Sequence, residues 1–418
     1  MDSKDEEVNG STDEVTSFDL ASETDETSVL SSVSETMGES GDSAGSGDPD
    51  QDPNCPEIVT KTIHITDEEI AMFRCLKEVH GTLNIAHSEL RDLKDFGQLR
   101  TVTESFQIEL NSELVSLAGL EHLKTIGGEL LIGNNPLLQD VSLPIGFRAF
   151  KSVRIVGNDS LTDLTSLAGE FPNTTGETGR TINIGNMPTT LHLAGLESIT
   201  LFEGEFLIHH NENLLDLQGL SSAMRGVRPL TDLQLNANPS LVSFAGLENL
   251  TELGRFDIAL QTSLRSMQGL NNLRKAREFY IVEEEALETL EGLESLEEVG
   301  RLGIGSCRVH MPVGSPKLRS IASLRNLKRV EEMHLIGSGV ETLEGLEGLE
   351  SVDYLTIAAN PNLPGALVDE LLARLDVKES VNCGNLGQTG PCPLCRSSGE
   401  GARSLKEEGL GKITRGAL

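Results

Sequence analysis

Short pairs of apolar residues, separated by a single residue, recur along the chain from residue 83 onward. The start-to-start spacing lies between 22 and 24 residues in eight of the eleven intervals. Because side chains alternate along a strand, each pair predicts a short strand with its apolar residues inward and its middle residue outward. A repeat of this length predicts one strand per turn of a parallel stack. The pairs begin at Leu83, Phe106, Leu130, Val153, Ile182, Phe206, Leu233, Phe256, Phe279, Leu302, Met333 and Leu355.

Behind each pair, apolar residues recur at every third position. One such run is Leu287, Leu290, Leu293, Leu296 and Val299. Period three fits neither an α-helix nor a strand, and it predicts an extended or 3₁₀-like return path with one side facing the core. A Gly before the third leucine predicts a corner with positive φ or close backbone approach. The corner glycines are Gly119, Gly195, Gly219, Gly246, Gly269, Gly292 and Gly345.

A further position, three residues after the last apolar residue of the strand, is often Asn. Stacked amide side chains satisfy backbone groups of neighbouring turns, so these residues predict a structural ladder. The predicted ladder residues are Asn111, Asn135, Asn158, Asn211, Asn238 and Asn360. In less regular repeats the same position is predicted to hold Ser88, Met187, Gln261, Glu284, Cys307 or Ser338.

The two ends of the chain differ from the repeats in composition. Residues 1–54 contain 16 acidic residues against one Lys and almost no large apolar groups, which predicts a disordered acidic linker. Residues 55–82 then form an N-terminal cap, and 83–363 the array of repeats. Residues 364–395 are predicted to be a C-terminal cap with a short amphipathic helix, because an open core end needs covering. Residues 396–418 are predicted to be a disordered tail.

The repeat unit, with its strand, Asn, period-three leucines and corner Gly, resembles the receptor L domain. The clearest copies are LLIGNNPLLQDV (130–141), LQLNANPSLVSFAGLENLTEL (233–253) and LTIAANPNL (355–363). The closing segment, NLPGALVDELLARL followed by VNCGNLGQTGPC, is similar to the C-terminal cap of bacterial L-domain surface proteins. The resemblance implies a mainly β fold: a right-handed parallel β-solenoid of about twelve leucine-rich turns with a short C-terminal capping helix. It does not carry hormone binding or signalling, because a fold does not determine function.

The net charge of −33 narrows the possible partners. Binding to phosphates requires a basic face, so the sequence predicts neither nucleic-acid binding nor adhesion to an anionic membrane. No apolar run reaches the length of a membrane-spanning helix, and Met1–Asp19 has no apolar signal segment. The expected location is extracellular or in the cell envelope, with a start upstream of the given one. A cytoplasmic location is the alternative.

Four cysteines flank the two ends of the repeat array. Cys55 and Cys75 lie before it, and Cys383 and Cys392 lie after it. Pairs at both caps would cross-link the least protected turns, which favours disulfides and an oxidising compartment. Four unrelated thiols in a cytosolic protein are the alternative. Cys307 is expected to be a buried structural thiol, and Cys392-x-x-Cys395 lacks the second pair of a zinc site.

No catalytic motif, cofactor motif or metal-ligand spacing is found in the sequence, so we expect a non-enzymatic protein without cofactor or metal. Adjacent His209 and His210 are expected to face opposite sides of a strand and not to act together. Glu283, Glu284 and Glu285 are expected to form a solvated corner. A carbohydrate-active β-helix enzyme remains a minor alternative.

The predicted function is therefore ligand binding at the cell surface or envelope, with a protein or a glycan as partner. The alternative is an intracellular interaction scaffold. The candidate contact residues face outward on the predicted strands: Arg154, Gln234, Asp257, Tyr280 and His334. Three longer turns, near 168–180, 223–231 and 307–317, are further candidates, because insertions in solenoids often carry binding.

Overall fold

The computed structural model describes residues 55–389 and 392, except 68, 150, 166, 171–179, 197–203, 222–230 and 309–310. The predicted linker and tail, and most of the insertions near 168–180 and 223–231, lie outside these residues. The described chain is a parallel β-solenoid of about twelve turns with one short helix, α2 (Gly365–Arg374), near the C-terminus. The predicted fold class is confirmed in these respects.

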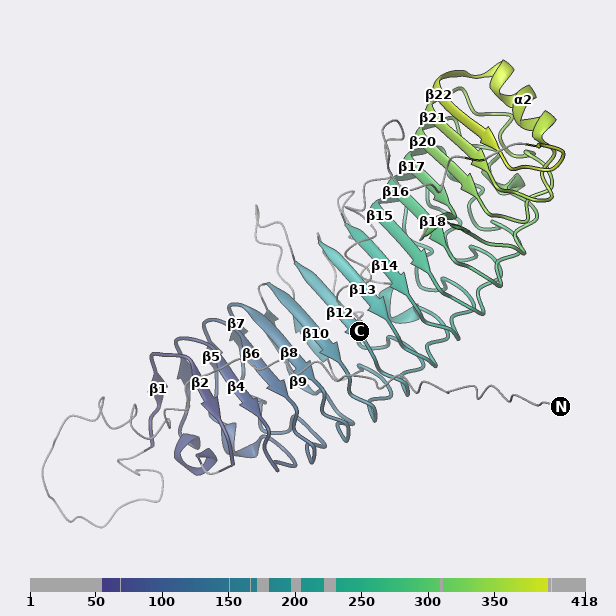
Figure 1. Ribbon diagram of the computed structural model, residues 1–418. Helices are drawn as coiled ribbons and strands as arrows, with labels where there is room; N and C mark the ends of the chain where they lie inside the picture. The colour runs from purple at the N-terminus through teal and green to yellow at the C-terminus, as the bar shows by residue number, and fades with distance from the viewer. Residues whose placement is uncertain are drawn as a thin grey trace, which may run out of the picture. The chain divides into compact units, whose positions relative to one another are not determined.

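Fourteen strands form the main sheet, stacked in chain order and all parallel (Figure 1). In each predicted pair the two apolar residues face the core, as Leu83 and Ile85 do. The strands are β2 (Ile63–Ile65), β4 (Leu83–Ala86), β6 (Phe106–Glu109), β8 (Glu129–Gly133), β10 (Ser152–Val156), β12 (Thr181–Gly185), β13 (Glu205–His209), β14 (Asp232–Asn236), β15 (Glu252–Ala259), β16 (Lys275–Val282), β17 (Glu298–Ile304), β20 (Arg329–Ile336), β21 (Ser351–Ala358) and β22 (Asp376–Cys383).

A second parallel sheet runs beside the first half of the array. Its strands are β1 (Ile58–Val59), β3 (Glu78–Val79), β5 (Thr101–Val102), β7 (Thr125–Ile126), β9 (Leu143–Ala149) and β11 (Leu167–Glu170). The second sheet ends where the spacing changes between the last apolar residue of the return path and the first apolar residue of the next main-sheet strand. From Ile126 to Leu130 the chain advances four residues and turns a corner at Gly127 and Gly128, so two strands result. From Leu253 to Phe256 it advances three, and a single eight-residue strand replaces the two.

The period-three return path packs against the sheet as predicted. The run from Leu287 to Val299 is buried at each of its five apolar positions. Six of the seven predicted corner glycines have positive φ, and at Gly292 a Cβ would lie 2.1 Å from the Met267 carbonyl oxygen. Gly219 is the exception, because it lies in a 3₁₀ turn. The short 3₁₀ segments are Ile70–Phe73, Lys94–Phe96, Gln218–Leu220 and Ala322–Leu324.

A ladder of buried polar side chains connects successive turns. Asn135 Oδ1 accepts the backbone N–H of Asn111 at 3.1 Å, and Asn135 Nδ2 donates to the Ile108 carbonyl at 2.9 Å. Each Asn thus satisfies a donor and an acceptor of the preceding turn, where water is excluded. The ladder position is occupied by Ser88, Asn111, Asn135, Asn158, Met187, Asn211, Asn238, Gln261, Glu284, Ser315, Ser338, Asn360 and Asn385.

The ladder corrects one sequence expectation. Cys307 does not occupy the ladder position, because its backbone lies in an inserted antiparallel hairpin of β18 (Ser306–Arg308) and β19 (Met311–Val313). Ser315 takes the position instead, fully buried, with its carbonyl accepting the Leu318 N–H at 3.1 Å. The inserted hairpin increases the number of residues between the strand and the ladder position, but the ladder position itself stays at the same place in the turn.

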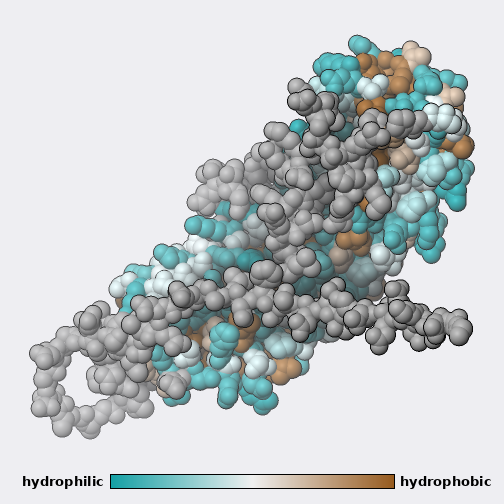
Figure 2. Space-filling view, viewed as in Figure 1, coloured by the Kyte–Doolittle hydropathy of each residue, from teal (hydrophilic) through white to brown (hydrophobic). Residues whose placement is uncertain are grey.

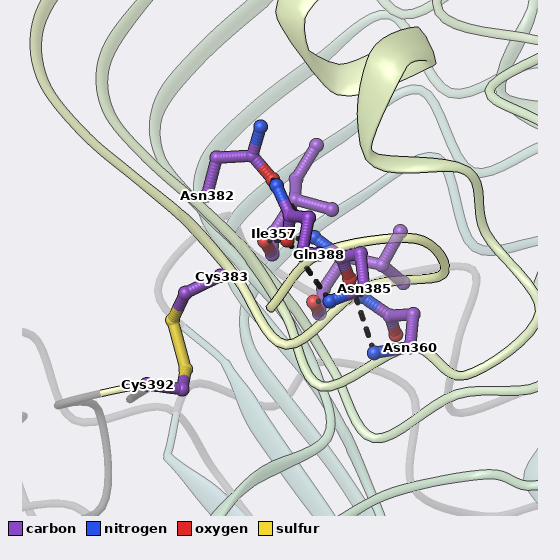
Figure 3. The surroundings of a disulfide bond; sticks show 8 residues. Ile357, Asn360, Asn382, Cys383, Asn385, Gln388 and Cys392 are labelled. Carbon is purple, nitrogen blue, oxygen red and sulfur yellow. Dashed lines mark hydrogen bonds between the residues drawn. A yellow bond between two sulfur atoms is a disulfide. The ribbon is translucent and has the colours of Figure 1, made fainter. Parts of the chain in front are cut away.

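The C-terminal end of the ladder is closed by side chains (Figure 3). Asn385 Oδ1 accepts from Asn360, and Asn385 Nδ2 donates to the Ile357 carbonyl at 2.8 Å. At the end of the array within the described residues, Gln388 Oε1 accepts the Asn385 N–H at 3.0 Å, in the place that a ladder residue of the next turn takes elsewhere. Helix α2 covers the core beside it, burying Val368.

Both predicted disulfides are present, and each lies at one end of the array. Cys55 is bonded to Cys75 in the N-terminal cap, and Cys383 to Cys392 beyond the last turn (Figure 3). The Cys392-x-x-Cys395 motif is therefore not a dithiol pair, because the Cys392 sulfur is already bonded to Cys383.

Candidate ligand-binding face

Four of the five predicted contact residues form one row across the outward side of the main sheet. Gln234, Asp257, Tyr280 and His334 lie in register on β14, β15, β16 and β20, with Gly303 on β17 between the last two. We call this row, with the charged residues two positions before each of its members, the polar face. Arg154 lies apart on β10, beyond β12 and β13, where its Nε is 3.7 Å from Glu129 Oε1.

The aromatic ring of Tyr280 lies flat across the next strand. A Cβ at Gly303 would be 2.6 Å from Tyr280 Cδ1, so only glycine leaves room for the ring there. On the other side of the row, the Arg255 guanidinium lies 5.3 Å from the ring centroid, within cation–π range. The ring and the guanidinium are therefore held in place before any ligand arrives.

The buried carboxylate of Asp257 holds the Arg255 guanidinium in place. Arg255 Nε donates to Asp257 Oδ2 at 2.7 Å, and only 3% of Asp257 is exposed. Burial raises the pKa of this carboxyl to about 6, although the attraction of Arg255 opposes the shift. Asp257 Oδ1 has no hydrogen-bond partner among the described residues.

Alternating charges continue along the face. Glu278 Oε2 lies 3.5 Å from Arg255 Nη1, and Glu278 Oε1 lies 3.6 Å from Arg301 Nη1. Arg301 Nε in turn lies 3.5 Å from Glu332 Oε2. His334 Nε2 lies 2.8 Å from Glu332 Oε1, a hydrogen bond that holds the pKa of Glu332 below its ordinary value.

This charged row was not predicted from the sequence, because only the residue between the two apolar positions of each strand was expected to face outward. The period of two places the residue before each pair on the same outward side. Arg255, Glu278, Arg301 and Glu332 all occupy that position, so the signal was present in the sequence.

The structure also corrects the expected exposure of the row. Asp257 and His334 are 3% and 8% exposed, so a ligand could contact only a small part of either side chain. Their neighbours on the face cover them, and they act as positioning groups. Tyr280 and Gln234 are half-buried, and the Arg301 side chain is 56% exposed, so these residues form the accessible part.

Two other sequence expectations are wrong. Glu284 is not solvated: it is fully buried in the ladder, and burial raises its pKa to about 8. His209 and His210 do not point apart, since their Nδ1 atoms lie 3.2 Å from each other. The positive φ of His210, at 55°, ends the strand alternation and turns its ring back toward His209. Across the described ranges, no group of three His, Cys, Asp or Glu side chains is placed to hold a metal ion.

The surface around the face is mixed in character. On the side shown in Figure 2, hydrophobic residues form small separate patches in a largely hydrophilic described surface. One of these patches lies at the C-terminal end of the solenoid. None of the helices in the described part of the chain is long and apolar enough to cross a membrane.

Comparison with known proteins adds little to this picture. No family model and no curated protein matches the chain. Among solved structures, the chain is similar to the crystal structure of a TLR13-ssRNA13 complex, at 15% identity over 78% of this chain, with a TM-score of 0.23. This chain spans 55% of the length of that one. The leucine-rich solenoid fold is shown by the strand pairing itself, and the receptor L-domain family remains an expectation from the repeat motif.

Proposed function

We propose that the protein is a non-enzymatic binding module that recognises a protein ligand through the polar face. The observation that carries the proposal is the Tyr280 ring, held across Gly303 and stacked by Arg255. Tyr and Arg dominate the energetics of protein interfaces, and a side chain that is already ordered loses little entropy on binding.

The charges of the face favour a protein over a glycan. Arg255, Glu278, Arg301 and Glu332 alternate in sign, and such a pattern selects a partner with complementary charges. A neutral glycan carries no charges that could complement this pattern. The ion pairs therefore support a flat, charge-patterned protein surface as the ligand.

Paired array experiments test the proposal. We expect the wild-type protein to bind one or more members of an extracellular protein array, and Tyr280→Ala combined with Arg301→Ala to weaken those signals at least tenfold. Gln107→Ala, at the equivalent outward position of β6, is the matched control and should bind as the wild type does. Equal loss in the control, or hits confined to a glycan array, would overturn the assignment.

We further propose that the protein works outside the reducing cytoplasm, at the cell surface or in the envelope. The two disulfides at the ends of the array support this location. Disulfide mapping of the protein isolated from its source without reductant tests it. Free thiols at these four cysteines would favour the alternative, an intracellular scaffold.

A further inference from the structure

A hollow of about 470 Å³ follows the corner of the solenoid, on the outer side of the ladder and away from the row of Tyr280. We call it the corner groove. One wall comes from the residue before each ladder position: Asn186, His210, Ala237 and Leu260. The other wall comes from the residue after it: Asp159, Pro188, Glu212 and Pro239. The ladder side chains turn inward beneath, which leaves the space between the walls open.

The dimensions of the groove fit an extended chain. Its walls come from five successive turns, and stacked strands lie about 4.8 Å apart, so the groove runs for roughly 19 Å. An extended peptide of about six residues has the same length. The groove floor does not compete for such a ligand, because the backbone N–H groups of Asn186, His210 and Ala237 already donate to the next turn.

One half of the groove offers hydrogen-bond acceptors. Asp159 and Glu212 are exposed carboxylates, and neither has an ion-pair partner within the described residues. His210 lies on the opposite wall. Burial, with the nearby charges of His210 and Arg154, lowers the pKa of His209 to about 4, so His209 is neutral at pH 7.

The hydrogen bonds then assign the tautomer of His209 and orient the His210 ring. His209 Nε2 donates to Asn183 Oδ1 at 2.9 Å, so its Nδ1 carries a lone pair. His210 Nδ1 lies 3.2 Å from that atom and donates to it. This contact holds the His210 ring on the groove wall.

The other half of the groove is apolar. It is formed by Ala237, Pro239 and Leu260. Leu260 is 41% exposed and has a positive φ of 64°. A large apolar residue in a left-handed backbone conformation costs stability and is usually replaced by Gly or Asn. Its side chain gives this half of the groove an exposed apolar surface.

From this charge complementarity we propose that the corner groove binds an extended, cationic polypeptide segment. Lys or Arg side chains would donate to Asp159 and Glu212, and apolar side chains would pack on Pro239 and Leu260. This site is independent of the polar face.

Fluorescence anisotropy with a labelled Lys-Ser-Lys-Ser-Leu-Leu hexapeptide tests the proposal. We expect Asp159→Asn with Glu212→Gln to weaken binding three- to tenfold. Glu285→Gln with Glu291→Gln removes the same charge from exposed sites outside the groove and should change binding less than twofold. Leu260→Asn, which relieves the backbone conformation and cannot be expected to unfold the chain, should weaken binding by a similar factor.

Three outcomes would overturn the proposal. The first is equal weakening by both charge pairs, which would mean diffuse attraction to an acidic protein. The second is equal affinity for a Glu-Ser-Glu-Ser-Leu-Leu peptide. The third is no binding of the basic peptide at millimolar concentration. Tyr280→Ala should leave the affinity unchanged, which separates this result from the fate of the polar face.

Discussion

Replacing Glu284 with Gln is expected to remove a large pH-dependent loss of stability. Glu284 is fully buried, and its Oε1 accepts the Gln261 N–H at 3.0 Å, while Oε2 has no partner among the described residues. Burial raises its pKa from 4.5 to about 8. Gln fits the same position, because Gln261 in the preceding turn donates from Nε2 to the Leu235 and Ala259 carbonyls.

The sign follows from proton linkage. The folded chain keeps the proton of Glu284 to higher pH than the unfolded chain does. The contribution of this group to the free energy of unfolding is therefore complete below pH 4.5 and is lost as the pH rises to about 8. The full loss is on the order of 4 kcal/mol. In the fold, Asp257 and His209 titrate at lower pH, so most of the change between pH 6.5 and 8 comes from Glu284. About 2 kcal/mol should disappear in that window.

Urea unfolding at several pH values measures the effect. The midpoint of the wild type should fall between pH 6.5 and 8, and that of Glu284→Gln should stay nearly constant. Glu285→Gln, at the exposed neighbour, should follow the wild type. A wild-type midpoint that does not change over this window, or a Gln variant that keeps the wild-type slope, would show that Glu284 is ionised in the fold.

Removing a central ladder amide is expected to destabilise the protein by about 3–5 kcal/mol. Asn238 Oδ1 accepts from the N–H and Nδ2 of Asn211 at 3.2 and 3.1 Å, and Asn238 Nδ2 donates to the Ile208 carbonyl at 3.0 Å. Asn238→Ala removes these partners from the Asn211 N–H, from one N–H of the Asn211 side chain and from the Ile208 carbonyl, while Asn211 Nδ2 keeps its bond to the Ile184 carbonyl. Each costs about 1–3 kcal/mol, because no water replaces the lost partner.

Asn249→Ala is the matched control for the ladder. Asn249 is exposed and makes one hydrogen bond, from Nδ2 to the Ser221 carbonyl at 3.1 Å. Chemical denaturation should show a change below about 1 kcal/mol for this variant. Similar losses in the two variants would mean that the ladder adds nothing beyond an ordinary surface amide.

The repeated features of the fold were predictable because each is local and recurs. The period of two within strands, the period of three behind them, and the Asn position together predicted the solenoid and its core. The second sheet was not predicted, although a spacing of four or three residues before each strand, as at Ile126 and Leu253, distinguishes the two halves.

Features that depend on one particular turn were not predictable in the same way. The hairpin of β18 and β19 transfers the ladder position from Cys307 to Ser315, which a fixed count along the sequence cannot detect. The stacking of Tyr280 on Gly303 requires the register of two strands. The contact of His209 with His210 requires a positive φ that the residue type does not indicate.

Charge alternation between turns adds specificity to the stacking. The basic residues of one return path meet acidic residues of the next, as Arg265 meets Glu288 and Arg274 meets Glu297. One turn after Glu288 the residue is basic again, and this Arg319 pairs with Glu341 of the following turn. Exposed pairs of this kind contribute little stability, but a shifted stack would bring like charges together.

Cysteine cross-linking across one turn tests most directly the central claim that successive repeats stack in parallel and in register. Asn84 and Gln107 are register partners whose side chains are hydrogen-bonded at 3.2 Å, and paired strands lie about 4.8 Å apart, within disulfide range. Peptide mapping without reductant should find the new disulfide in Asn84→Cys/Gln107→Cys. It should be absent from Asn84→Cys/Glu109→Cys, where the backbone separation is roughly 8 Å. Cross-linking of the second pair in preference to the first would contradict the register of the solenoid.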